Sequence, residues 1–224
     1  MRIDELPMPA RVAARPRDER GYPVPAITPW QDGLPQFALT SLPRTYICAM
    51  EHRCSICGDA MAPGPVWRVL AGPEADAAAE ALAAGRRFLN RAPTAEAPGH
   101  RACMLYAAIT CPYLARPAAR RGRPVDLLGL SAERGGRRGL GGAVAAFEKV
   151  QFQLGSVVMF RFAGLTEFLQ HDLGTDQSAA LAAELAAADP EPRQPIPVYL
   201  LPDEADAQRR FEELRRNGPV LPVS

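Results

Sequence analysis

The chain has 224 residues, of which 47% are hydrophobic and 23% are charged, and its formal net charge is +1. A charge so close to zero excludes a strong overall attraction to nucleic acid or to anionic membranes. No run of about 18 apolar residues occurs, so no transmembrane helix is expected. The first 20 residues lack the apolar core of a secretory signal, which indicates an unexported, cytoplasmic protein. In that reducing compartment, the five cysteines favour metal ligation or free thiols over disulfides.

The N-terminal half begins with residues 1–20, which are polar and without periodicity and predict a flexible arm. Asp32-Gly33, between short apolar segments, predicts a tight hairpin turn. Residues 65–71 predict a strand. Residues 73–90 predict a helix with acidic residues in its first turn and arginines near its end. A second helix is expected over residues 100–114, with Cys111-Pro112 marking its end.

The C-terminal half begins after a glycine- and arginine-rich stretch at residues 116–142, which predicts a flexible basic connector. The remaining residues have the pattern of a small α/β unit. Its expected elements are two strands within residues 150–162, a helix at 176–188, a short strand at 197–201 and a helix at 202–217.

A metal-binding pattern lies in the first half of the chain. Cys54-Ser-Ile-Cys57-Gly58 is followed by His100-Arg-Ala-Cys103. A Cys-x-x-Cys-Gly turn brings two sulfurs onto one ion, and two ligands three residues apart in the first turn of a helix share one face. We therefore expect Cys54, Cys57, His100 and Cys103 to hold Zn²⁺. The Cys54–Cys57 turn, called the knuckle below, is followed by a strand and then by the ligand-bearing helix. This order is typical of a treble-clef zinc finger, although residues 73–99 form a long insertion.

Cys111 is the competing fourth ligand. On a continuous helix it lies roughly 12 Å along the axis from Cys103, at about 1.5 Å per residue. Zinc bonds are only about 2.0–2.3 Å long, so Cys111 joins the site only if the helix breaks early. A closed set of four protein ligands indicates a structural ion, because catalytic zinc keeps one position open. Cys48 and Cys111 are expected to be ordinary core residues.

Several zinc enzymes are excluded by their motifs. The chain has neither the His-x-Glu element of zinc deaminases nor the His-Glu-x-x-His of zincins. A nuclease built on a treble clef needs further histidines, and only His52 and His171 remain. His52 is expected at the surface, or bonded to a thiolate. His171-Asp172 is expected to be a polar pair at a helix end rather than a catalytic base with its carboxylate.

Arginines give the connector a local positive charge, although the whole chain is nearly neutral. Lys149 is the only lysine in the chain, so the arginine content reflects a general bias and each arginine is weak evidence by itself. The candidates for nucleic-acid contacts are Arg116, Arg120, Arg121, Arg123, Arg134, Arg137 and Arg138. The alternative to nucleic-acid binding is that this stretch is a mobile loop whose arginines are simply solvated.

The chain resembles a family of uncharacterised proteins of high-GC actinobacteria and their phages. The resemblance covers about residues 20–117 and follows Arg20–Pro25, Cys54-x-x-Cys57-Gly58, the segment from Asn90 to Cys103, and Cys111-Pro112. It implies no activity. Asn90, Arg91 and Glu96 match its pattern, and they are candidates for a polar pocket beside the metal or for hydrogen bonds that support the metal loop, with Cys111 nearby.

Together these patterns predict an α+β protein: a flexible arm at 1–20, a zinc-stabilised treble-clef-like domain at 21–115, a connector at 116–142 and a small α/β unit at 143–224. The expected function is an interaction module that binds nucleic acid or a partner protein. The alternative is a metal-containing enzyme acting on a small-molecule or nucleotide-derived substrate at a site between the two units.

Overall fold

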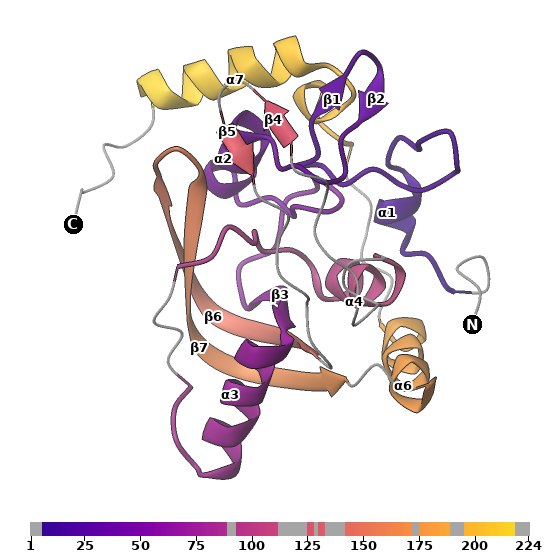
Figure 1. Ribbon diagram of the computed structural model, residues 1–224, viewed down its shortest axis with the longest axis vertical. Helices are drawn as coiled ribbons and strands as arrows, with labels where there is room; N and C mark the ends of the chain where they lie inside the picture. The colour runs from indigo at the N-terminus through magenta and orange to yellow at the C-terminus, as the bar shows by residue number, and fades with distance from the viewer. Residues whose placement is uncertain are drawn as a thin grey trace.

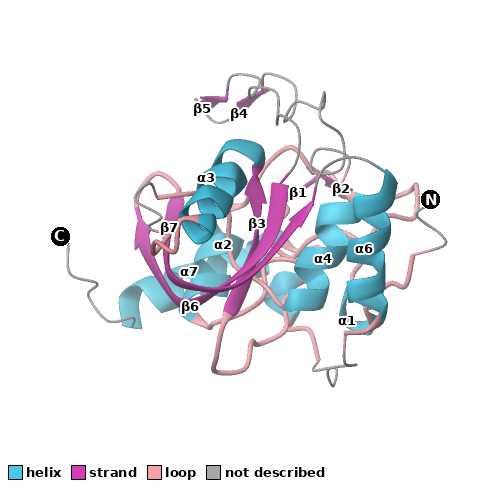
Figure 2. Cartoon of the chain, turned by 90° about the horizontal axis from the view of Figure 1, so that it is seen from below, coloured by secondary structure: helices cyan, strands magenta, loops and turns pink. Residues whose placement is uncertain are grey.

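The computed structural model describes residues 6–88, 93–111, 125–127, 130–132, 142–171, 175–188 and 195–217. It is a mixed α/β structure in which helices pack with a three-stranded antiparallel sheet (Figures 1 and 2). The helices are α1 (Ala10–Ala13), α2 (Leu42–Met50), α3 (Gly72–Ala83), α4 (Arg101–Thr110), α6 (Thr175–Ala186), the 3-10 turn η2 (Val198–Leu200) and α7 (Glu204–Asn217). The strands are β1 (Trp30–Gln31), β2 (Leu34–Pro35), β3 (Val66–Ala71), β4 (Val125–Leu127), β5 (Leu130–Ala132), β6 (Gly142–Leu154) and β7 (Val158–His171).

The main sheet has the order β3-β6-β7, with β6 at its centre. The residues of β6 that pair with β3, from Gly142 to Phe147, are all buried, and those beyond Phe147 are mostly exposed or half-buried. The far half of the β6–β7 hairpin reaches α2, where Phe152 meets Tyr46 edge-on with ring centroids 6.1 Å apart. The predicted strand at 65–71 and the two within 150–162 are confirmed. The latter two extend further because each finds a neighbour to pair with.

Helix α2 is an element that the sequence analysis did not predict. The Ser41 side chain caps it by accepting a hydrogen bond from the backbone N–H of Arg44 at 3.4 Å, and a proline lies in its first turn. Both features are typical of a helix start. The helix buries Tyr46, Ile47 and Cys48, so packing stabilises a helix only nine residues long.

Other predicted elements differ in extent or type. The turn at Asp32-Gly33 is confirmed, with positive φ at both residues, and joins β1 to β2. Helix α3 ends at Ala83 rather than at residue 90, and Gly85 follows with a φ of 63°. The predicted strand at 197–201 is wrong: Val198–Leu200 forms a 3-10 turn after Pro197. The helices expected at 100–114, 176–188 and 202–217 correspond to α4, α6 and α7.

The N-terminal segment packs against the rest of the protein. Residues 6–20, which the sequence predicts to be a flexible arm, contain buried side chains: Val12 is 1% exposed and Arg15 is 3% exposed. Arg17 also forms a bridge to Pro23. Burial of Leu6 and Val12 together with the apolar stems of Arg11 and Arg15 explains how so polar a segment is held in place. Residues 1–5 lie outside the described residues.

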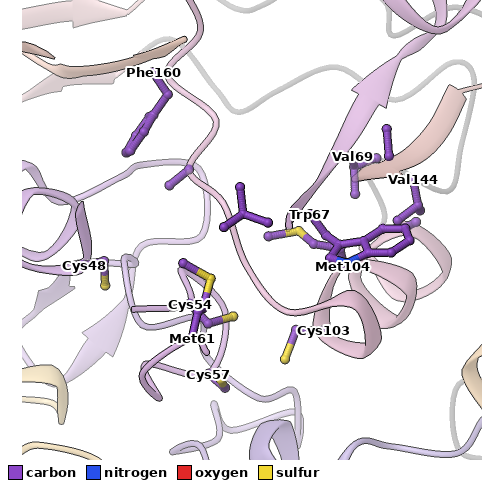
Figure 3. Close-up of a cluster of buried hydrophobic side chains, with 14 of the residues drawn as sticks. Cys48, Cys54, Cys57, Met61, Trp67, Val69, Cys103, Met104, Val144 and Phe160 are labelled. Atoms are coloured by element: carbon purple, nitrogen blue, oxygen red, sulfur yellow. The ribbon is translucent and has the colours of Figure 1, made fainter. Parts of the chain in front are cut away.

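The expected division into two units is not visible in the core. Strand β3 comes from the predicted zinc domain, whereas β6 and β7 come from the predicted C-terminal unit, and the three form one sheet. One hydrophobic cluster contains Trp67, Met104, Val144 and Phe160 (Figure 3). Within the predicted connector, residues 125–127 and 130–132 form the antiparallel strand pair β4–β5. Within the described ranges, no helix has the length and apolar character needed to cross a membrane.

Candidate metal centre

The first half of the candidate site is a tight knuckle at Cys54–Cys57. Arg53 and Ala60 form an antiparallel bridge at its base, and the Cys54 N–H donates to the carbonyl of Asp59 at 2.9 Å. The Gly58 N–H donates to the Cys54 carbonyl at 2.9 Å, with Gly58 at a φ of 84° that favours glycine. This turn directs both sulfurs inward, and both cysteines are fully buried.

The second half comes from the start of α4. The segment before this helix is fixed to β3, because Trp67 and Gly99 exchange two backbone hydrogen bonds of 3.0 and 2.9 Å. The knuckle holds the same segment, since the Ser55 N–H donates to the Pro98 carbonyl at 3.0 Å. His100 is the N-cap residue of α4, and Cys103 lies in the first turn. Two neighbouring segments therefore place this pair of ligands opposite the knuckle.

The four side chains meet as the spacing predicted. The ligand atoms of Cys54, Cys57, His100 and Cys103 all lie within 4.8 Å of one another, and all four residues are buried. Figure 3 shows the sulfur of Cys103 on the side of the knuckle cysteines, with Cys48 set apart from them. Bonds of about 2.0–2.3 Å to a tetrahedral ion separate ligand atoms by roughly 3.3–3.8 Å. The distances from His100 Nδ1 to the sulfurs of Cys57 and Cys103, 3.4 and 4.0 Å, are close to this range.

The orientation of His100 fits coordination through Nδ1, the nitrogen that faces the sulfurs. A neutral imidazole bound in this way carries its proton on Nε2, which donates to the Ala60 carbonyl at 3.2 Å. Arg11 Nη1 lies 2.9 Å from the same Nε2 and is itself a donor. With a metal on Nδ1, that Arg11 N–H needs another acceptor, and the Asp59 carboxylate has Oδ2 3.7 Å from Nη1.

The three thiols of the site influence one another. Burial raises the pKa of Cys54, but hydrogen bonds from Cys103, Cys57 and His100 outweigh burial and hold this pKa well below its ordinary value. The hydrogen bonds to Cys54 and Cys57 raise the pKa of Cys103. One thiolate is thus stabilised by its neighbours before any ion is considered. A divalent cation supplies the charge needed for all three sulfurs to be thiolates.

Buried arginines surround the knuckle, and the sequence analysis missed them. Arg11 and Arg15, from α1 and the residues after it, lie beside the ligands. Burial, followed by repulsion from Arg44, lowers the pKa of Arg15 to about 10, while the thiols of Cys48, Cys57 and Cys54 oppose this shift. Arg15 therefore keeps its charge at neutral pH. The signal in the sequence was the i, i+4 spacing of two arginines around Val12.

The other candidate residues lie away from the cluster or outside the described residues. Cys111 is the half-buried C-cap residue of α4 and is not among the four clustered ligands. Glu96 Oε2 is 4.0 Å from Nη1 of Arg68 on β3. Cys48 is buried on α2, where burial raises its pKa to about 12. The candidates that lie outside the described residues are Asn90, Arg91, Arg116, Arg120, Arg121, Arg123, Arg134, Arg137 and Arg138.

The two remaining histidines belong to different parts of the fold. His52 is exposed at the base of the knuckle and has a φ of 50°. His171 is 3% exposed at the end of β7, opposite Gly142. The expected position of His171 at a helix end is therefore wrong, because β7 continues to this residue.

Comparison of the chain with protein-family models, with curated proteins and with solved structures finds no match.

Proposed function

We propose that the chain is a zinc-stabilised interaction module whose metal centre is treble-clef-like. The observation that carries the proposal is the buried set of three cysteines and one histidine whose ligand atoms lie within 4.8 Å of one another. Thiolate and imidazole are the ligands that zinc prefers, and four of them complete a tetrahedron. Knuckle, strand β3 and ligand-bearing helix α4 follow in the treble-clef order, with the Trp67–Gly99 bridge joining the last two.

A structural role follows from the closed set of ligands. Each ligand residue is less than 10% exposed, so a bound ion has little contact with solvent. The ion would connect the knuckle to α4, and the burial of Cys54 and Cys57 within the hydrophobic core makes metal binding part of folding.

The metal content of purified protein tests this role. Mass spectrometry should find one zinc per chain in the wild type and in Cys111→Ser, and a loss of zinc in Cys54→Ser, His100→Ala and Cys103→Ser. The three depleted variants should also unfold at lower urea concentration, because the ion contributes folding free energy. Zinc that survives loss of His100, or that is lost from Cys111→Ser, would contradict the proposed ligand set.

Nucleic acid is the partner class that we propose first, because the arginines between residues 116 and 138 form the one distinctly basic stretch of the sequence. Binding of a fluorescent RNA or DNA oligonucleotide should weaken steeply with added salt, since each phosphate contact releases a counterion. Replacing Arg120, Arg121 and Arg123 with glutamine should reduce the salt slope while the zinc content stays unchanged. Absence of binding at low salt would favour a protein partner.

A cavity favours a second candidate, the metal-containing enzyme. Its volume is about 230 Å³, and two metal ligands, His100 and Cys103, line it together with Arg11. The remaining lining residues are mostly apolar: Pro7, Met8, Pro9, Ala10, Ala102, Leu185, Ala186 and Ala188. Small-molecule sites typically combine apolar walls with a few polar groups in this way.

Cobalt substitution separates the two candidates. A closed structural site should give the absorption bands of four-coordinate Co²⁺ with thiolate ligands, unchanged by added azide. An enzyme site requires a position open to water or substrate, so azide should shift the bands. A shift in wild type that disappears when Ala102→Phe fills the cavity would favour the enzyme.

A further inference from the structure

Among the residues that the structure describes, four arginines are almost fully buried, and three of these have a carboxylate partner. The pairs are Arg11–Asp59 at 3.7 Å, Arg44–Glu204 at 2.7 Å and Arg68–Glu74. Arg15, which is 3% exposed, has no carboxylate partner within the described ranges. A buried cation is costly unless an opposite charge lies close to it. The question is which negative charge balances Arg15.

The hydrogen bonds of Arg15 hold the side chain in place without neutralising it. Nε donates to the Val24 carbonyl at 2.9 Å, and Nη2 donates to the Leu200 carbonyl at 2.9 Å. Nη1 is buried and makes no hydrogen bond to the residues described. These contacts use two edges of the guanidinium group and leave Nη1 available for an electrostatic interaction.

The open side of the guanidinium group faces the metal knuckle. Nη1 lies 3.6 Å from the position that a Cβ atom would take on Gly58, the residue after Cys57. The same position is 3.2 Å from Leu200 Cδ1 and 3.4 Å from Ala26 Cβ, so the glycine allows close packing here. Burial and repulsion from Arg44 lower the pKa of Arg15 overall, and the thiols of Cys48, Cys57 and Cys54 oppose this shift, as nearby negative charge would.

The net charge of an occupied metal centre would be equal in size and opposite in sign to the charge of Arg15. Three thiolates, a neutral imidazole and a divalent cation together carry one net negative charge, and Arg15 carries one positive charge. The neighbouring Arg11 and Asp59 balance each other. We propose that Arg15 is the counter-charge of a divalent metal–thiolate centre and a determinant of its metal affinity, which rests on the proposed function above.

The inference explains why the N-terminal segment is part of the fold. Arg15 connects three segments that are distant in sequence: the end of the N-terminal segment, the knuckle and η2. A counter-charge in a medium of low dielectric acts over several ångströms without direct contact with the ion. Arg15 is therefore a positioning residue for the metal centre rather than a ligand.

The test is a competition between the folded protein and a chromophoric chelator for Zn²⁺ at pH 7. Arg15→Met should bind zinc about 10- to 100-fold more weakly than wild type, the range found when residues that support metal ligands are removed. Arg15→Lys, which keeps the charge, should recover most of the lost affinity. Arg44→Met is the matched control: Arg44 is equally buried but paired with Glu204, so its loss should leave zinc affinity unchanged.

Each outcome bears on one proposal. If wild type binds no zinc, the proposed function fails. If wild type binds zinc and Arg15→Met binds it equally well, the metal site stands and the counter-charge is overturned. Equal losses in Arg15→Met and Arg44→Met would also overturn it, because the effect would then be general destabilisation. Should Arg15→Met not fold, Arg15→Lys decides alone: near-wild-type affinity supports the inference, and a loss of tenfold or more overturns it.

Discussion

At the scale of single residues, Gly99 shows how closely the candidate metal centre is packed. A Cβ atom on this residue would lie 2.8 Å from the sulfur of Cys54 and 2.5 Å from Met104 Cε. Gly99 is also fixed by its two hydrogen bonds to Trp67. The methionine end is flexible and can shift, but the sulfur cannot move far and remain a metal ligand.

We therefore predict that Gly99→Ala weakens zinc binding and lowers the free energy of unfolding by about 1–3 kcal/mol, the usual cost of overpacking a core. Chelator competition and urea unfolding measure the two effects. Gly155→Ala is the control, because a Cβ at that turn meets only the Val157 carbonyl oxygen, at 3.7 Å. Wild-type zinc affinity in Gly99→Ala would show that Cys54 is not held at the position described.

At the scale of elements, Glu51 joins α2, the knuckle and α7. Its carboxylate accepts hydrogen bonds from the Tyr199 hydroxyl at 2.6 Å, from Arg53 Nε at 2.6 Å and from Arg210 Nε at 2.8 Å. Arg53 also donates to the Gly58 carbonyl at 3.2 Å. Burial alone raises the pKa of Glu51, but these three donors outweigh it and hold the pKa below its usual value.

A carboxyl group whose pKa is lower in the folded protein stabilises the fold above its unfolded pKa. That stabilisation is lost as the pH falls through the folded value. Glu51→Gln should therefore reduce the free energy of unfolding at pH 7 by about 1–3 kcal/mol, the size expected for hydrogen bonds to a charged group. The difference from wild type should shrink as the pH falls below about 4.3.

Urea unfolding of both proteins between pH 7 and pH 3 measures the effect. Glu80→Gln provides the control, since Glu80 is 81% exposed and its pair with Arg86 is a surface contact. If the difference in the free energy of unfolding between wild type and Glu51→Gln does not change with pH, the charge of the carboxylate does not contribute to stability.

At the scale of the whole molecule, the two halves of the chain share one core. Strand β6 is buried only where β3 covers its edge, from Gly142 to Phe147, and β3 lies in the first half of the chain. Helix α7 packs on α2 from the first half, with the Phe211 and Tyr46 rings 5.2 Å apart. The second half alone would expose these surfaces.

We predict that a fragment of residues 143–224 does not fold by itself, because a lone two-stranded hairpin with its apolar face uncovered is marginal in water. Circular dichroism and amide-proton dispersion in NMR would show this, with the full chain as the folded control. A cooperative thermal transition in the fragment would contradict this prediction and support the two-unit organisation expected from the sequence.

The sequence by itself determined the features that depend on neighbouring residues. The Cys54–Cys57 turn, the positions of His100 and Cys103 in one helical turn, and the turn at Asp32-Gly33 all follow from the spacing and φ preferences of a few residues. The positions of β3 and of the three longer helices from α4 onward were predicted for the same reason, although helix and strand ends were not.

Only the tertiary structure determined which distant segments lie in contact with those features. The Trp67–Gly99 bridge brings the two ligand pairs together, Arg15 comes to the knuckle from the N-terminal segment, and β3 pairs with β6 across more than 70 residues. The physical reason is that burial and charge balance depend on which surfaces the folded chain places in contact. The sequence of a polar segment such as residues 6–20 predicts solvent exposure, and only the fold shows that Arg15 of this segment lies against the buried cysteine turn.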